Sequence, residues 1–215
     1  MRWLTAVMLA VLAPLAGAGN QKYEPLAASV QSQMQSTVSD QATPFLAFDT
    51  LAEARAWLNA MSRRLERHMP DRQAREEFLV TVHYEAKRAG LDPQLVLGLI
   101  QVESNFRKYA VSSTGARGYM QVMPFWVKLI GSAEHNLFHL RTNLRYGCTI
   151  LRHYLTLENG DLFRALGRYN GSLGQAAYPL MVERAWTRDW NYHRAGAAGE
   201  SPPDKISAQP VARRR

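Results

Sequence analysis

The sequence lacks the cysteine pairs that a disulfide-stapled fold needs, because Cys148 is the single cysteine among 215 residues. It also lacks an apolar run of the roughly 20 residues that span a membrane as a helix. The longest uncharged apolar stretch runs only from Trp3 to Gly19. With 47% apolar residues the chain is too hydrophobic for a disordered protein, so a globular fold remains. The length favours one domain of roughly 150 residues with additional segments at its ends.

The apolar stretch near the N-terminus has the features of an export signal. It follows Arg2 and ends in the small residues Ala16, Gly17 and Ala18, which are typical of the segment before a signal-peptidase cleavage site. We therefore predict that residues 1–18 are a signal peptide, with an uncleaved N-terminal anchor as the alternative. Removal of this segment would leave an exported, soluble protein in the periplasm.

Two further segments differ in composition from the rest of the chain. Residues 19–48 are rich in Gln, Ser and Ala without a sustained apolar period, which predicts a flexible lead-in. Residues 196–215 turn to Ala, Gly, Pro and charge, which predicts a disordered basic tail. The formal net charge is +8, and basic proteins attract polyanions such as cell-wall polymers or anionic membrane surfaces. Nucleic acid is not expected as a partner, because the export signal opposes it and no known nucleic-acid-binding pattern is recognisable.

Apolar residues recur at helical spacing through most of residues 49–195, and no run alternates as a strand does. We therefore predict an all-α domain over this range. Its first helix follows the capping-box pair Thr50 and Glu53, the second is capped by Asp71, and the third begins at Asp92 followed by a proline. Further helices are predicted near Pro124–Ile130, Leu144–Leu157, Leu162–Tyr169 and Pro179–Trp190.

The predicted helix from Pro93 to Ser104 is apolar on almost every side, so we expect its neighbours to bury it. Its last turn carries Glu103, whose side chain lies above apolar residues of the preceding turn. Desolvation and the negative end of the helix dipole both favour the neutral carboxylic acid, so we predict a raised pKa for Glu103. Such a group suits general acid catalysis, because the best proton donor titrates close to the operating pH. By pattern alone, a terminal glutamate that reaches out to water is the alternative.

Three separated motifs include this glutamate and follow it along the chain. They are Glu103-Ser104, Gly115-Ala116-Arg117-Gly118-Tyr119-Met120-Gln121-Val122-Met123-Pro124, and Arg168-Tyr169-Asn170. In this order they resemble the soluble lytic transglycosylase family, whose members share the SLT domain, and the resemblance covers about residues 78–190. It implies an α-helical, lysozyme-like fold, here with an N-terminal helical extension.

The resemblance also implies an activity. In that family the glutamate that matches Glu103 is the single catalytic acid and base of a peptidoglycan lyase. It protonates the bridging oxygen of the β-1,4 bond between N-acetylmuramic acid and N-acetylglucosamine. It then takes a proton from the muramic acid's own primary hydroxyl, and a 1,6-anhydro ring closes without water. Ordinary glycosidases use two carboxyl groups, and no Asp or Glu lies between Glu103 and Gly131, although carboxyl groups from elsewhere could fold back. Those carboxyl groups belong to Glu134, Glu158, Asp161 and Glu183.

Further site residues follow from the resemblance. Ser104 matches the residue that supports the carboxylate, and Ser112 has the spacing of a serine that contacts the saccharide. Gln121 matches a sugar-binding glutamine, and Met123 resembles a groove-lining position. For Ser104, a structural hydroxyl that bonds a helix carbonyl is the alternative.

The third motif adds two residues. Tyr169 matches a tyrosine that packs against the sugar, and Asn170 matches an asparagine that helps to position the acid. By pattern alone, Asn170-Gly171 is an ordinary helix terminator. Two residues depart from the family pattern, because Arg168 stands where a small residue is common and Tyr119 where Leu or Ala is usual. Both are expected to add bulk near the groove.

No metal or other cofactor is expected. His135 and His139 have a spacing that could ligate zinc on a helix, but no third ligand is patterned nearby. The implied partner is the glycan strand of peptidoglycan, and the protein is expected to be a monomer. Two alternatives stay open: a muramidase on the same fold that uses water, and a non-catalytic wall-binding component of an envelope-spanning secretion or pilus apparatus.

Overall fold

The computed structural model describes residues 21–192, and this part of the chain consists of helices and connecting loops without a β-strand. The helices are α1 (Ala28–Ser39), α2 (Leu51–Leu65), α3 (Arg72–Arg88), α4 (Pro93–Ser104), α5 (Phe125–Ile130), α6 (Leu140–Leu157), α7 (Leu162–Asn170), α8 (Ala177–Arg184) and the π-helical segment η1 (Ala185–Asp189). The predicted all-α class is confirmed. The predicted signal peptide and C-terminal tail lie outside the described residues.

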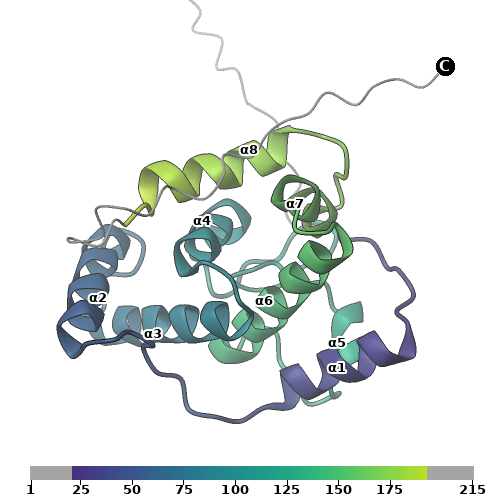
Figure 1. The fold of residues 1–215 in the computed structure, drawn as a ribbon, viewed down its shortest axis with the longest axis horizontal. Helices are drawn as coiled ribbons and strands as arrows, with labels where there is room; N and C mark the ends of the chain where they lie inside the picture. Colours follow the sequence, from purple (N-terminus) through teal and green to yellow (C-terminus); the bar gives the residue numbers. More distant parts are fainter. Residues whose placement is uncertain (1–20, 193–215) are drawn as a thin grey trace, which may run out of the picture.

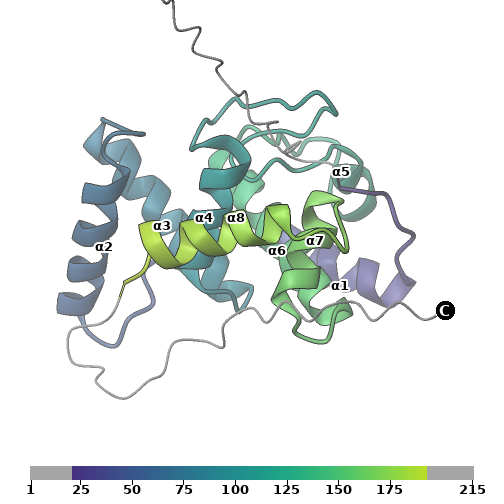
Figure 2. The ribbon, with the colours of Figure 1, turned by 90° about the horizontal axis from the view of Figure 1, so that it is seen from above.

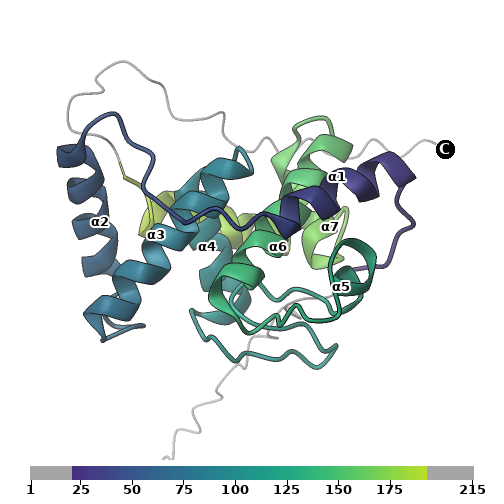
Figure 3. The same cartoon turned by 90° about the horizontal axis from the view of Figure 1, so that it is seen from below.

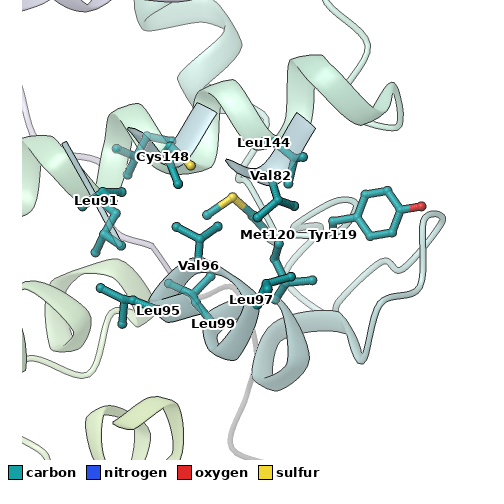
Figure 4. Packing of buried hydrophobic residues seen from close by; sticks show 14 of the residues in the cluster. Val82, Leu91, Leu95, Val96, Leu97, Leu99, Tyr119, Met120, Leu144 and Cys148 are labelled. Atoms are coloured by element: carbon teal, nitrogen blue, oxygen red, sulfur yellow. The ribbon is translucent and has the colours of Figure 1, made fainter. Parts of the chain in front are cut away.

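Helix α4 lies in the middle of the molecule, with α3, α8 and η1 packed against it (Figure 1). Its apolar side chains are buried on several sides, as predicted, and they share one core with residues of α3, α6 and the loop after α4 (Figure 4). Gly98 allows the close approach of η1, because a Cβ atom at this position would lie 2.7 Å from the backbone nitrogen of Trp186. The last turn of α4, which carries Glu103, is therefore part of a helix that is packed closely by its neighbours.

The ends of the helices largely follow the predicted signals. Thr50, Asp71 and Asp92 each accept a hydrogen bond from an N–H group in the first turn of α2, α3 and α4. Helix α6 begins at Leu140, earlier than predicted. The sequence pattern did not reveal this start, because the residue before it makes no side-chain cap bond. The last predicted helix is divided into α8 and η1.

Helix α1 lies within residues 19–48, for which the composition predicts a flexible lead-in. That prediction missed the helix, which packs on α5 and α6 (Figure 3). Met34 and Val38 are its buried residues. Two buried positions are too few to produce a sustained apolar period, so the sequence pattern contains no amphipathic signal here.

The connection between α4 and α5, residues 105–124, has no helix and lies beside α5 on one side of the molecule (Figure 2). Two isolated antiparallel bridges, Val111 with Arg117 and Arg117 with Val122, shape it. Elsewhere, Cys148 is buried on α6, where desolvation raises the pKa of its thiol and keeps it protonated (Figure 4). Across residues 21–192, no helix combines the length and apolar character that crossing a membrane requires.

His83 is a buried aromatic residue whose titration makes the stability of the protein depend on pH. Its side chain on α3 is 1% exposed, and its ring stacks on Phe48 at 4.6 Å and meets the edge of Trp57 at 4.9 Å between centroids. Desolvation, with a smaller contribution from Lys87, lowers the pKa of His83 from 6.5 to about 4. The imidazole is therefore neutral in the folded protein at pH 7.

We expect the free energy of unfolding to fall as the pH drops from about 6.5 to 4. In this range the unfolded chain binds a proton at His83 that the folded protein excludes, which costs about 3 kcal/mol of stability by pH 4. Urea denaturation at several pH values measures the slope, and His83→Phe is the matched variant because it keeps an aromatic ring without a titratable group. Equal pH slopes for the variant and the wild type would contradict this assignment.

Candidate active site

Glu103 occupies the last turn of α4 and is 4% exposed, so the predicted burial of its carboxyl group is confirmed. Its Oε1 atom accepts a hydrogen bond of 2.5 Å from the hydroxyl of Tyr178. Tyr178 belongs to α8 and is 2% exposed. The site therefore contains a carboxyl group and a phenol that come from two packed helices.

Tyr178 is held in its protonated form. Desolvation raises the pKa of its hydroxyl well above the usual value, and the neighbouring charge of Glu103 acts in the same direction. The phenol therefore donates its hydrogen bond across the neutral range. Sequence reasoning did not pair Tyr178 with the acid, because no local pattern links it to a glutamate 75 positions away.

Ser104 follows the glutamate but is directed toward the backbone. Its hydroxyl donates to the carbonyl of Tyr119 at 2.7 Å and to that of Ile100 at 3.2 Å, the helix-carbonyl bond that was the alternative for this residue. The side chain thus joins the end of α4 to the following loop. Its neighbour Tyr119 is also buried, with its ring 4.9 Å from that of Phe78. The bulk of Tyr119 is therefore packed inside the protein, although we expected it near the groove.

Gln121 holds the same loop from within. It adopts a left-handed backbone conformation with φ of 47°, and its side chain is buried. The Nε2 atom donates to the carbonyl of Gly118 at 2.9 Å and to that of Ala110 at 3.1 Å. The amide that the resemblance assigns to sugar binding thus closes the loop in this structure.

Ser112 and Met123 are more accessible than the other predicted site residues. Ser112 is half-buried, accepts a hydrogen bond from the Ala116 N–H group at 3.0 Å and lies 2.8 Å from the Thr114 hydroxyl oxygen. Met123 is half-buried at the start of α5. Both belong to the loop that Ser104 and Gln121 shape.

Tyr169 and Asn170 lie at the end of α7. The Tyr169 ring is fully buried, and its hydroxyl donates to the carbonyl of Met120 at 2.8 Å. Desolvation raises its pKa well above the usual value, and the charge of Glu103 contributes, so the ring lies within electrostatic reach of the carboxyl group. Asn170 is buried, and the helix stops at Gly171 with φ of 80°, as the terminator pattern predicts.

Three of the predicted site residues therefore converge on one loop. Ser104, Gln121 and Tyr169 all donate to backbone carbonyls between positions 110 and 120. Sequence reasoning missed a fourth support, Asn143 of α6, whose amide oxygen accepts from the Met120 N–H at 2.8 Å. The available signal was its spacing, because Asn143 lies three residues after Leu140 and beside Leu144, where a polar side chain on an apolar helix face needs hydrogen-bond partners.

The side chains of Arg168 and His135 interact with other side chains of the protein. Arg168 forms ion pairs with Glu158 and, at 3.0 Å, with Glu24, so its charge is engaged although we expected bulk near the groove. His135 lies 2.7 Å from a tyrosine hydroxyl, and His139 precedes α6. Within the part of the chain that the structure describes, no group of three or more His, Cys, Asp or Glu side chains could hold a metal ion.

Comparison with known proteins identifies a domain within the chain. Residues 81–181 match the transglycosylase SLT domain. The chain is 35% identical over 96 residues to the transglycosylase of Enterobacteria phage PRD1, which covers 45% of this chain and 35% of the phage protein. It is 50% identical over 48 residues to the membrane-bound lytic murein transglycosylase C of Actinobacillus pleuropneumoniae serotype 5b (strain L20), and 44% identical over 48 residues to that of Haemophilus influenzae (strain PittEE). Each of these two matches covers 22% of this chain and 13% of the relative.

The all-α architecture of residues 21–192, together with the SLT match, agrees with the lysozyme-like fold of this domain. Residues 81–181 match the transglycosylase SLT domain that the motif resemblance implied. The match includes Glu103, Gln121 and Tyr178. It does not include α1 or α2.

Proposed function

We propose that this protein is an exported lytic transglycosylase that cleaves the β-1,4 bond between N-acetylmuramic acid and N-acetylglucosamine in peptidoglycan without water. The observation that carries the proposal is the Glu103 carboxyl group, which is buried on a central helix and accepts a hydrogen bond from Tyr178. Burial favours the protonated acid, and the phenol favours the carboxylate, so the two effects oppose each other. A carboxyl group in this balance can release a proton and recover it.

In the first step, protonated Glu103 donates its proton to the bridging oxygen, and the bond between that oxygen and C1 of the muramic acid breaks. The substrate's own acetamido group meets the positive charge that develops at C1. In the second step, the Glu103 carboxylate takes the proton of the muramic acid's 6-hydroxyl as this oxygen forms a bond to C1. The proton balance closes, because Glu103 ends the cycle protonated as it began.

Tyr178 stabilises the carboxylate between the two steps. Its own pKa is raised, so the phenol does not deliver a competing proton to the substrate at neutral pH. The hydrogen bond of 2.5 Å also holds the carboxyl group in one orientation, and such positioning is a large part of the rate that enzymes achieve. We assign Tyr178 to the machinery together with Glu103.

The predicted site residues divide into a group that contacts the saccharide and a group that supports the site. Ser112 and Met123, which are half-buried, are assigned direct contact with the glycan strand. Gln121 is assigned a contact from the resemblance alone, because its side chain is buried and donates to carbonyls of the loop. Ser104, Tyr169 and Asn170 are assigned to the support of the loop and of the acid, because they are buried. Peptidoglycan glycan strands are the partner, and the names of two relatives, which refer to murein, support this substrate. Export to the periplasm and a monomeric state belong to the same proposal.

Digestion of purified peptidoglycan followed by mass spectrometry tests the reaction. We expect muropeptides with 1,6-anhydro ends, which are lighter by one water than the products of hydrolysis. Products with ordinary reducing ends would instead identify a muramidase on the same fold. Unchanged peptidoglycan would overturn the assignment of an enzyme.

A further inference from the structure

Gln21 is the first residue that the structure describes, and its side chain is buried with 4% exposure. Its Oε1 atom accepts hydrogen bonds from the Met123 N–H at 3.2 Å and from the Trp126 indole N–H at 3.1 Å. Its Nε2 atom donates to the carbonyl of Gln121 at 3.4 Å. One side chain from the predicted lead-in thus binds the backbone around two predicted saccharide-contact residues, about 100 positions away in the sequence.

The same side chain also reaches the third motif. A hydrogen bond from Gln21 to Tyr169 partly offsets the raised pKa of that phenol. Tyr169 in turn donates to the carbonyl of Met120. Gln21 therefore joins the loop after α4 to the end of α7, although it lies outside the SLT match at residues 81–181.

The segment that carries Gln21 is anchored at further points. Glu24 pairs with Arg168 at 3.0 Å, and Arg168 also pairs with Glu158. Further along, Gln31 in α1 donates to the carbonyl of Leu129 in α5 at 2.7 Å. Arg168, which departs from the family pattern, thus holds the N-terminal segment against α6 and α7.

We propose that Gln21 is a positioning residue of the active site, and that the segment N-terminal to the SLT match completes the glycan-binding loop. This inference rests on the proposed function. An amide side chain suits the task, because it offers a donor and an acceptor at once to a loop that has no helix or sheet of its own. Gln121 sits in a left-handed conformation, which is costly for a residue other than glycine and persists only when its surroundings hold it.

Gln21→Ala tests the proposal, with Gln31→Ala as the matched control. Both substitutions remove an amide that holds the same N-terminal segment, but Gln31 binds the Leu129 carbonyl in α5, whereas Gln21 binds the backbone of Gln121 and Met123. With soluble glycan strands as substrate, we expect Gln21→Ala to lower kcat/KM about tenfold or more, mainly through a higher KM, because a misplaced contact weakens binding. Gln31→Ala should stay within about twofold of the wild type. Equal effects of the two variants on kcat/KM would overturn the proposal.

A spectroscopic measurement keeps this proposal separate from the proposed function. The Met123 amide and the Trp126 indole give identifiable signals in a ¹H–¹⁵N NMR spectrum, and their hydrogens exchange slowly while Gln21 accepts from them. We expect Gln21→Ala to shift both signals, to speed their exchange and to weaken binding of tri-N-acetylchitotriose, while Gln31→Ala leaves all three unchanged. If the wild type cleaves no glycan, the proposed function fails, and this spectrum alone decides on Gln21. Unchanged signals and unchanged saccharide binding in Gln21→Ala would overturn its role as a positioning residue.

Discussion

Glu103→Gln is expected to lower the rate of peptidoglycan cleavage about 10²- to 10⁴-fold, the range that removal of a general acid or base produces. The amide keeps the size of the carboxyl group and still accepts from the Tyr178 hydroxyl, but it carries no transferable proton at neutral pH. Because one residue is assigned both proton transfers, we expect the loss at the upper end of this range. The measurement is release of soluble muropeptides, with circular dichroism to show that the helices are unchanged.

Glu183→Gln is the matched control for this result. Glu183 lies on α8, the helix that also carries Tyr178, and it is one of the carboxyl groups that could have served as a second catalytic group. The one-carboxyl mechanism requires that this variant keep its activity. A large loss in Glu183→Gln would instead indicate a two-carboxyl hydrolase. A Glu103→Gln variant that releases muropeptides as fast as the wild type would contradict the single-acid lyase. A wild type that binds peptidoglycan and releases no muropeptides would instead favour the wall-binding component of a secretion or pilus apparatus.

Glu85→Gln should destabilise the protein by about 3 to 5 kcal/mol, the cost of breaking a buried ion pair by removing one partner. Glu85 of α3 has a side chain that is 1% exposed, and it pairs at 2.9 Å with Arg145 of α6, which is 5% exposed. Arg88 and Arg141 approach the same carboxylate at 3.4 and 3.5 Å. Without the charge of Glu85, the three guanidinium groups would lose the carboxylate that they share, and Asp40, which pairs with Arg88 at 3.0 Å, would remain as the neighbouring anion.

This network also holds the end of α1. Arg145 donates to the carbonyls of Val38 and Asp40, and Arg88 donates to that of Thr37 at 2.7 Å. Hydrogen exchange in Glu85→Gln should therefore increase first in α1.

Denaturant unfolding measures the loss, and Glu76→Gln is the control. Glu76 pairs with Arg72 on the surface of α3, where the arginine side chain is 75% exposed. Removal of such an exposed partner should change the stability far less than removal of Glu85. An equal midpoint for Glu85→Gln and the wild type would show that the buried network contributes nothing to the fold.

The helices and their caps could be predicted because their causes are local. The caps at Thr50, Asp71 and Asp92 depend on residues two or three positions away, and the burial of α4 follows from its own apolar composition. The pattern placed Glu103 above apolar residues but left open whether its carboxyl group reaches water, and the packing of α8 with Tyr178 decided this. Helix α1 could not be predicted, because its contacts with α5 and α6 involve too few apolar residues to leave a pattern.

The roles of several predicted site residues depend on contacts that no local pattern contains. Motif matching assigned Ser104 to the carboxylate and Tyr169 to the sugar, while the structure directs both hydroxyl groups to backbone carbonyls of one loop. The direction of a side chain is set by the segment packed against it, and here that segment comes from another part of the chain.

The amino-acid order alone was sufficient for the all-α class and the central helix, because both follow from periodicity within about 15 residues. Tertiary packing decided which residues form hydrogen bonds with Glu103 and with the loop after α4. Tyr178 meets Glu103 across 75 positions, and Gln21 meets Gln121 across 100. Hydrogen bonds of this kind form only after the helices have packed, since packing brings the donor and the acceptor within 3.5 Å of each other.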